Sequence, residues 1–108
     1  MIQVFCASKG AGKTKRLIKL ANERLFQSKG DSVYIDNKSK NMMHLKMNIR
    51  FINTGELGIN DFDSFYGLLC GIISQNYYVE NIYIENIRMI DIPKEGIILT
   101  TYYEFGNN

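Results

Sequence analysis

The sequence predicts an α/β fold: a small three-layer, mostly parallel sheet of about five strands with helices on its faces. Short apolar, β-branched segments alternate along the chain with amphipathic segments at helical spacing. The candidate strands are apolar throughout, which is typical of parallel strands buried on both faces. A glycine-rich loop joins the first strand to the first helix. The 108 residues form one domain, 1–108, since two domains would each be too short for an ordinary core.

The first strand and first helix flank this loop. Residues 2–6 are short and apolar, which predicts a buried strand. A helix is expected from Lys13, with Lys and Arg between its apolar positions. Those apolar positions are Leu17, Ile18, Ala21 and Leu25. The helix should stop near Ser28, because Gly30 is placed to take the left-handed conformation that ends many helices.

In the middle of the chain, apolar strand segments again alternate with polar or helical segments. Residues 32–36 predict a second strand that ends in a carboxylate, Asp36, and residues 50–53 predict a short third strand. The polar, Lys- and Asn-rich stretch between them, 37–48, fits either a loop or one short helix.

A second helix follows, capped by Asn60 or Asp61. Its apolar face consists of Phe62, Phe65, Tyr66, Leu69, Ile72 and Ile73. Gly67 and Gly71 each cost about 1 kcal/mol relative to alanine inside a helix. That cost predicts a close approach of this helix to the sheet or to a neighbouring helix.

The last strands are expected at 81–85 and 97–102, with 11 residues between them. Two arrangements remain open. A single helical turn bridges a parallel pair, or a tight turn at 93–96 makes a hairpin. We favour the parallel pair, although 11 residues are barely enough for a crossover connection.

Residues 7–14 carry the most specific motif in the chain. They read Ala-Ser-Lys-Gly-Ala-Gly-Lys-Thr and match the phosphate-loop pattern G-x-x-x-x-G-K-[ST], except that Ala7 stands where glycine is usual. The glycines let consecutive backbone N–H groups turn around a phosphate, and the following helix adds its positive dipole end. Lys13 is expected at the terminal phosphates and Thr14 at a Mg²⁺ ion. The predicted nucleotide-binding residues are Ser8, Lys9, Gly10, Ala11, Gly12, Lys13, Thr14 and Lys15.

A magnesium site of this kind also needs an acid at the end of an apolar strand. Two strands qualify: 82–85 ends in Glu85, and 33–36 ends in Asp36. We expect Glu85 to hold Mg²⁺ through water and keep Asp36 as the alternative.

The two halves of the chain differ in charge. Residues 1–50 hold 11 Lys or Arg and 3 Asp or Glu, whereas residues 51–108 hold 2 and 8. A basic half around a phosphate loop suits an anionic ligand.

Other classes of protein find little support. No apolar run approaches the length of a membrane span, and the first residues lack the basic region of a signal peptide, so we expect a cytoplasmic protein. Cys6 and Cys70 have neither metal-ligand nor disulfide spacing and are expected to be small buried hydrophobes. His44 has no Cys or His partner nearby.

With these residues in place, the chain resembles the P-loop NTPase superfamily, and its RecA-like branch more than its GTPase branch. Residues 5–14 are similar to the opening of small, uncharacterised ATP-binding proteins of clostridial type. Stretches like 49–54, 65–67 and 82–85 also occur in those proteins, so the resemblance covers residues 1–86. It implies a Mg²⁺–nucleotide site, and a homo-oligomer that completes its site across a subunit boundary.

The resemblance also bears on hydrolysis. Asn86 occupies the position at which the RecA-like branch carries a hydrolytic glutamate, and an amide cannot accept a proton from water. Arg88 is a candidate sensor of the terminal phosphate, and Thr100 and Thr101 are candidate polar sensors. We expect slow or absent hydrolysis.

The predicted function is therefore binding of Mg²⁺ with a nucleotide, ATP being favoured and GTP kept as the alternative, in a regulatory or assembly-forming protein. Adenine is expected because the guanine pattern Asn-Lys-x-Asp is absent. One alternative is a small kinase or phosphotransferase in which Asp36 contacts the acceptor. A second is a nucleic-acid-binding module that uses the basic residues of the first half, although no recognition motif supports it.

Overall fold

Parallel strands form the centre of the fold, a computed structural model that describes residues 2–7, 12–76, 78–85 and the backbone of 100–105. In chain order they are β1 (Ile2–Ala7), β2 (Asp31–Asp36), β3 (Ile49–Asn53) and β4 (Val79–Glu85). They lie in the order β3-β2-β4-β1, and every neighbouring pair is parallel. The backbone of β5 (Thr100–Phe105) pairs in parallel with the outer side of β1.

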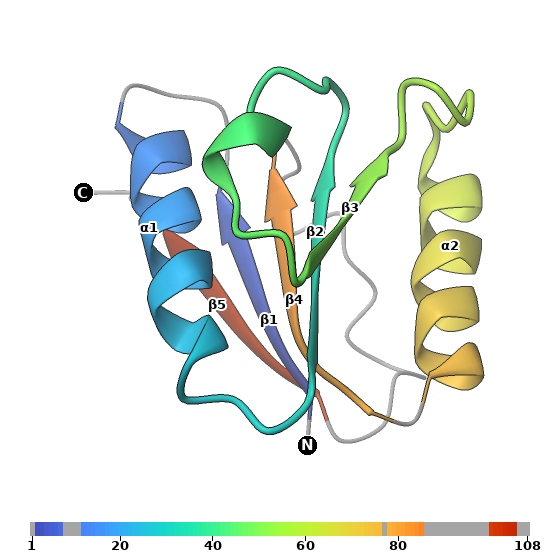
Figure 1. The fold of residues 1–108 in the computed structure, drawn as a ribbon. Helices are drawn as coiled ribbons and strands as arrows, with labels where there is room; N and C mark the ends of the chain where they lie inside the picture. Colours follow the sequence, from blue (N-terminus) through green and yellow to red (C-terminus); the bar gives the residue numbers. More distant parts are fainter. Residues whose placement is uncertain (1, 8–11, 77, 86–99, 106–108) are drawn as a thin grey trace.

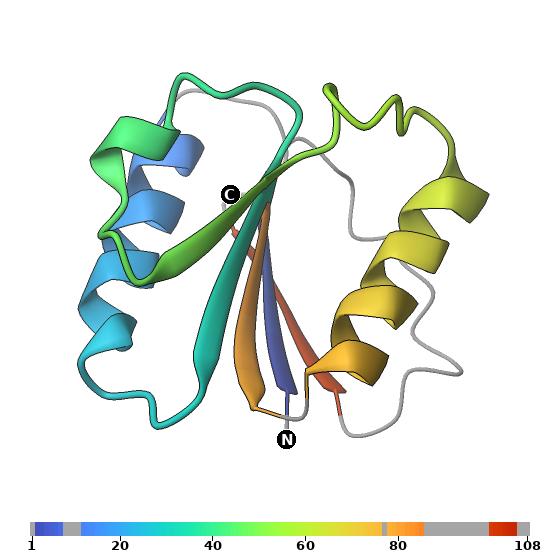
Figure 2. The same ribbon diagram turned by 45° about the vertical axis from the view of Figure 1, so that its right-hand side comes forward.

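The predicted α/β class is confirmed, and so is the parallel sheet. Helices α1 (Lys13–Leu25) and α2 (Phe62–Gln75) lie on opposite faces of the sheet, so the described residues form three layers (Figures 1 and 2). The hairpin alternative for the last two strands is wrong, because β4 and β5 lie on opposite sides of β1 and both run parallel to it. The proposed bridging turn falls in 86–99, outside the described residues.

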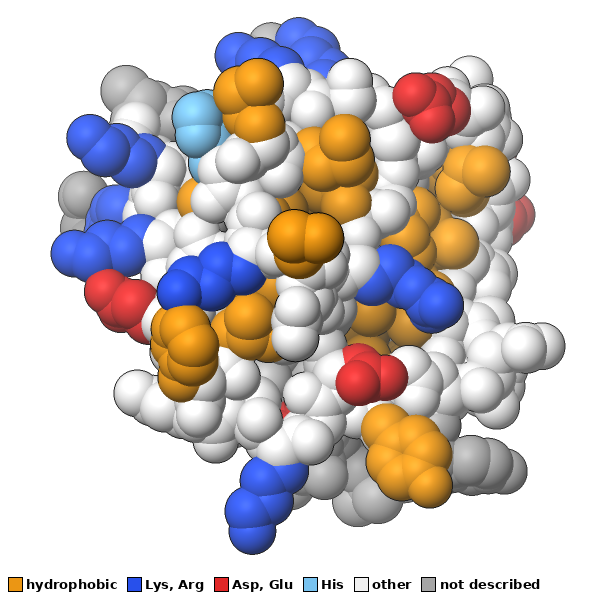
Figure 3. Space-filling model, viewed as in Figure 1, with side chains coloured by type: hydrophobic (Ala, Val, Ile, Leu, Met, Phe, Trp, Pro, Cys, Tyr) orange, Lys and Arg blue, Asp and Glu red, His pale blue; other side chains and the backbone are white. Residues whose placement is uncertain are grey.

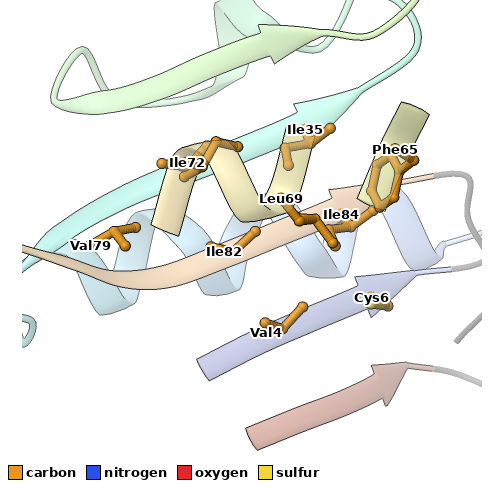
Figure 4. Packing of buried hydrophobic residues seen from close by; sticks show 10 residues of the cluster. Val4, Cys6, Ile35, Phe65, Leu69, Ile72, Val79, Ile82 and Ile84 are labelled. Atoms are coloured by element: carbon orange, nitrogen blue, oxygen red, sulfur yellow. The ribbon is translucent and has the colours of Figure 1, made fainter. Parts of the chain in front are cut away.

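One hydrophobic cluster fills the space between α2 and the sheet (Figure 4). The helix points Phe65, Leu69 and Ile72 at the sheet, because these positions recur every three or four residues on one face. The strands meet them with the inward side chains Val4, Cys6, Val33, Ile35, Val79, Ile82 and Ile84. Each of these residues is at most 8% exposed, so this layer is shielded from solvent.

The opposite face of the sheet is aromatic. Tyr34 of β2 and Tyr83 of β4 lie with ring centroids 6.0 Å apart, and Phe5 of β1 stacks on Tyr83 at 5.3 Å. Leu17 and Ala21 of α1, both fully buried, pack against this row. This packing holds α1 against the sheet.

A polar network ties the other end of α1 to the amino-terminal edge of the sheet. The Arg24 guanidinium donates to Gln3 and to the fully buried Asn81 Oδ1, at 3.0 Å from Nη2, and lies 4.9 Å from the centre of the Phe5 ring. Asn81 Nδ2 donates onward to Ser28 Oγ at 2.6 Å. With its buried amide satisfied, this edge anchors the helix end.

The ends of both helices test two sequence predictions. Helix α2 is capped by Asp61, whose Oδ1 accepts from the Ser64 backbone N–H at 2.8 Å, as expected. The cap predicted for α1 is wrong: the helix ends at Leu25 and Gly30 is not left-handed.

Gly30 is required for close packing instead. Its N–H donates to Glu80 Oε2 at 2.8 Å, and a Cβ at this position would lie 2.3 Å from the Tyr78 carbonyl oxygen. Since that atom belongs to backbone, the clash cannot be relieved by a side-chain rotation.

We therefore expect Gly30→Ala to lower the free energy of unfolding by about 1–3 kcal/mol, measured by urea denaturation. Gly67→Ala is the matched control, because Gly67 is exposed inside α2 and a Cβ there meets nothing within 4 Å. It should raise stability by about 0.5–1 kcal/mol. Equal effects of the two substitutions would contradict the packing role of Gly30.

The open space around Gly67 and Gly71 contradicts the prediction that these glycines mark a close approach of α2 to another element. Neither glycine marks a close approach, because no atom lies within 4 Å of a Cβ built at either position. Both face away from the sheet on the exposed side of α2.

Between β2 and β3, residues 37–48 form a loop that contains one short 3₁₀ helix, η1 (Met42–His44). Both features that the sequence left open for this stretch, a loop and a short helix, are therefore present. In the part of the chain that the structure describes, no helix has the length and apolar character needed to cross a bilayer.

Candidate functional site

The end of the glycine-rich loop is described from Gly12 onward. Gly12 has φ +80°, in the left-handed region that favours glycine, and its carbonyl oxygen accepts from the Arg16 N–H at 3.2 Å in the first turn of α1. No atom lies within 4 Å of a Cβ built at Gly12, so conformation rather than space demands glycine here. The predicted site residues Ser8, Lys9, Gly10 and Ala11 lie outside the described residues. Lys13 is half-buried and Lys15 is exposed in the first turn of α1.

Thr14 and Glu85 meet at the carboxyl edge of the sheet. Strands β1 and β4 are neighbours in a register that places Ala7 beside Glu85, so the acid lies next to the strand end that leads into the loop. The Thr14 hydroxyl donates to Glu85 Oε2 at 2.9 Å, across 71 residues of chain. The two residues predicted to form a magnesium site are therefore in direct contact.

Tyr34 holds the other oxygen of this carboxylate. Its hydroxyl donates to Glu85 Oε1 at 3.1 Å, and its ring is fully buried between Tyr83 and Phe51. Burial, followed by the nearby Glu85 charge, raises the pKa of Tyr34 far above its usual value, so the hydroxyl keeps its proton and remains a donor. Sequence reasoning missed this residue. The signal in the sequence was an aromatic residue with a hydroxyl group between the aliphatic residues Val33 and Ile35, two positions before Asp36.

The environment of Glu85 disfavours its charge. Burial raises the pKa of this carboxyl; the hydrogen bonds from Thr14 and Tyr34 act in the opposite direction, and the neighbouring Asp36 charge raises the pKa further. Glu85 is only 5% exposed. A cation placed beside it would favour the ionised form, because opposite charge offsets the cost of burial.

Asp36 lies at the same edge of the sheet but has other partners. Its Oδ1 accepts from the backbone N–H groups of Asn37 and Lys38, at 2.6 and 3.3 Å, and its Oδ2 accepts from Asn41 Nδ2 at 3.3 Å. This buried carboxylate organises the loop that follows β2. Among the hydrogen bonds of the described residues, the Thr14 hydroxyl donates to Glu85, whereas these donors to Asp36 come from the loop after β2.

The oxygen atoms gathered here suit magnesium. Mg²⁺ is bound in proteins by one or two carboxylates together with water and substrate phosphates, rather than by a complete protein cage. The Thr14 hydroxyl and the Glu85 carboxylate fit that pattern. Within the described residues no group of three or more His, Cys, Asp or Glu side chains is placed to hold a metal, so an ion at this edge would take its remaining ligands from water and phosphate.

The other candidates are spread through the molecule. His44 is exposed on η1, Cys6 is buried in the core, and Cys70 is only partly buried, so the expectation of two buried cysteines holds for Cys6 alone of the pair. Asn86 and Arg88 lie outside the described residues, as do the side chains of Thr100 and Thr101.

The raised pKa of Glu85 predicts a pH dependence of stability. A carboxyl whose pKa is higher in the folded than in the unfolded chain binds more protons when folded, so its contribution is present below the ordinary glutamate pKa. The contribution is lost as the pH rises through the raised value. We expect the free energy of unfolding of the wild type, measured relative to Glu85→Gln, to fall across that window.

Urea denaturation of both proteins at closely spaced pH values from 4 to 8 measures this difference. Glu80→Gln is a control for a half-buried glutamate elsewhere on β4. A wild-type stability that rises with pH relative to Glu85→Gln would overturn the prediction.

Comparison with known proteins finds no relative of this chain. A scan against protein-family models finds no match, and searches of curated proteins and of solved structures find no significant match.

Proposed function

We propose that this protein binds a nucleotide together with Mg²⁺ and hydrolyses it slowly or not at all. One observation carries the proposal: Thr14, the last residue of a phosphate-loop pattern, donates to the buried Glu85 carboxylate at the carboxyl edge of a parallel sheet. Ligands of open α/β sheets bind at this edge. The left-handed Gly12 at the start of α1 supports the same reading.

Each described residue has a role in this proposal. Backbone N–H groups at the start of α1 face the phosphates with the positive end of the helix dipole behind them. Lys13 contacts the terminal phosphates, Thr14 binds Mg²⁺, and Glu85 orients water bound to the ion. Tyr34 positions the Glu85 carboxylate through its hydrogen bond. When bound, Mg²⁺ supplies positive charge that neutralises the phosphate oxygens.

Weak hydrolysis is proposed from sequence. Asn86 follows Glu85 directly, and its amide cannot act as the general base for an attacking water. The protein would then act as a nucleotide-dependent regulator or assembly subunit in the cytoplasm, with ATP as the expected nucleotide and a homo-oligomer as the assembly that the resemblance implies. We propose in addition that the chain is related to the RecA-like branch of the P-loop NTPases.

Calorimetry with ATP, ADP and GTP, each with and without Mg²⁺, tests the proposal. Binding of ATP that strengthens with Mg²⁺ is the expected result, followed by little phosphate release in a turnover assay on the same sample. Absence of binding for all three nucleotides would overturn the proposed function. Rapid turnover would overturn the proposed lack of a general base.

A phosphotransferase is the second candidate, because the buried Asp36 lies at the same edge as Glu85, on the neighbouring strand β2. Transfer of phosphate from ATP to a member of a nucleoside or small-molecule panel would support it. Nucleic-acid binding is less favoured: on the face in Figure 3, the Lys and Arg side chains are spread among hydrophobic and uncharged groups. A steep decrease of DNA affinity with salt would be its signature.

A further inference from the structure

A groove runs beside the outer face of α1, between the helix and the segment that contains η1. Its volume is about 720 Å³, within the range of about 300–1,000 Å³ of small-molecule sites. Figures 1 and 2 both show η1 next to α1. The lining residues are Gly12, Thr14, Lys15, Ile18, Lys19, Asn22, Glu23, Asn41 and His44.

The groove begins where the proposed phosphate site lies. Gly12 and Thr14 belong both to its lining and to the glycine-rich loop. From Thr14 the wall continues along one face of α1 through Ile18 to Asn22, because these residues are four apart. At 1.5 Å per residue, that wall is about 12 Å long, which is long enough for a nucleoside attached to phosphates at Thr14.

Hydrogen bonds fix the two walls relative to each other. Asn22 Nδ2 donates to the His44 carbonyl oxygen at 2.9 Å, and Asn22 Oδ1 accepts from the Lys46 N–H at 2.9 Å. At the other end, the bond from Asn41 Nδ2 to Asp36 ties the η1 segment to the edge of the sheet. The groove is therefore a formed site, held at both ends, rather than a gap between loose segments.

The chemistry of the walls suits a flat heterocycle joined to an anion. Carbon atoms form most of the lining surface, and Ile18, at the middle of the helical wall, is the one large hydrophobic residue among the described lining residues. The exposed Lys15 stands near the loop end, whereas the charge of Lys19 is partly balanced by Glu23, 4.0 Å away on the next turn. Net positive charge therefore lies toward the end of the groove that adjoins Thr14, and the side chain of Ile18 lies beyond it.

We propose that this groove binds the base and ribose of the nucleotide whose phosphates lie at Gly12–Thr14. The inference rests on the proposed function and extends it: the loop recognises phosphate, and the α1–η1 groove selects a nucleoside over a bare polyphosphate. The base packs against Ile18. The η1 segment, held by the hydrogen bonds of Asn22 and Asn41, forms the opposite wall.

Comparison of MgATP with inorganic magnesium tripolyphosphate tests the groove separately from the loop. Calorimetry should show that the wild type binds MgATP more tightly. In Ile18→Ala this preference should shrink by about 3- to 10-fold, the effect of losing part of one apolar contact, while tripolyphosphate affinity stays unchanged. Ile73→Ala is the matched control, since Ile73 is a partly buried isoleucine on α2, across the sheet, and it should leave both affinities unchanged.

A second measurement does not depend on a variant. The side-chain amide resonances of Asn22 should shift when MgATP is added and stay in place with magnesium tripolyphosphate. Equal wild-type affinities for the two ligands, or unmoved Asn22 resonances on saturation with MgATP, would overturn the groove assignment while leaving phosphate binding intact. Failure of both ligands to bind would instead overturn the proposed function, and the groove assignment with it.

Discussion

Replacing Lys13 with alanine should weaken the binding of MgATP by about 10- to 100-fold, the usual effect of losing hydrogen bonds to a charged group. The side chain stands one residue before Thr14, in the first turn of α1, where the loop delivers it to the terminal phosphates in the proposed complex. Since the lysine is half-buried rather than part of the dry core, the fold should tolerate its loss. Calorimetry on the folded variant measures the change.

Lys29→Ala is the matched control for this substitution. It removes the same charge from the same basic half of the chain, at an exposed position beyond the end of α1. Its affinity for MgATP should match that of the wild type within about twofold, because a distant surface charge is screened by salt. If Lys13→Ala and Lys29→Ala show equal thermal shifts with MgATP, the proposed role of Lys13 fails.

Leu17→Ala should lower the free energy of unfolding by about 2–5 kcal/mol. Leu17 is fully buried and packs α1 against the aromatic row that includes Phe5, Tyr34 and Tyr83. Truncation would leave a cavity between rigid rings, which have little freedom to close it. A loss of this size lowers the melting temperature of a domain of this length by at least about 10 °C.

The same substitution at Leu57 provides the comparison. Leu57 is 59% exposed in the loop before α2, so Leu57→Ala should change stability by no more than about 0.5 kcal/mol. Melting curves of both variants, read by circular dichroism, separate the two cases. A Leu17→Ala protein as stable as Leu57→Ala would mean that α1 is not held by this packing.

Local features of the fold were predictable from short stretches of sequence. The Asp61 cap follows from an acidic residue placed before an apolar helical pattern, and it is present. The start of α1 at Lys13, directly after a glycine, follows from the loop pattern. Such features depend on the sterics and hydrogen bonds of neighbouring residues, which a single sequence contains in full.

Predictions about glycines failed where distant parts of the chain decide the outcome. Gly30 looked like a helix cap, but the close approach of Tyr78 and Glu80 accounts for it. Gly67 and Gly71 looked like contact points, but the face of α2 that carries them is exposed. In each case the deciding neighbour, or its absence, lies outside the local window.

For the candidate site, too, some features were predictable from local sequence and others depended on the tertiary structure. Sequence alone determined that a phosphate-loop pattern lies between a strand and a helix, and that Asp36 and Glu85 each end an apolar strand. Only the tertiary structure decided which acid meets Thr14, because the β1–β4 register brings Glu85 to the Thr14 hydroxyl while N–H groups of the following loop donate to Asp36. It also brought Tyr34 to the carboxylate and formed the groove beside α1. Strand order and register arise from packing between residues far apart in the chain, and no local pattern encodes which ends will meet.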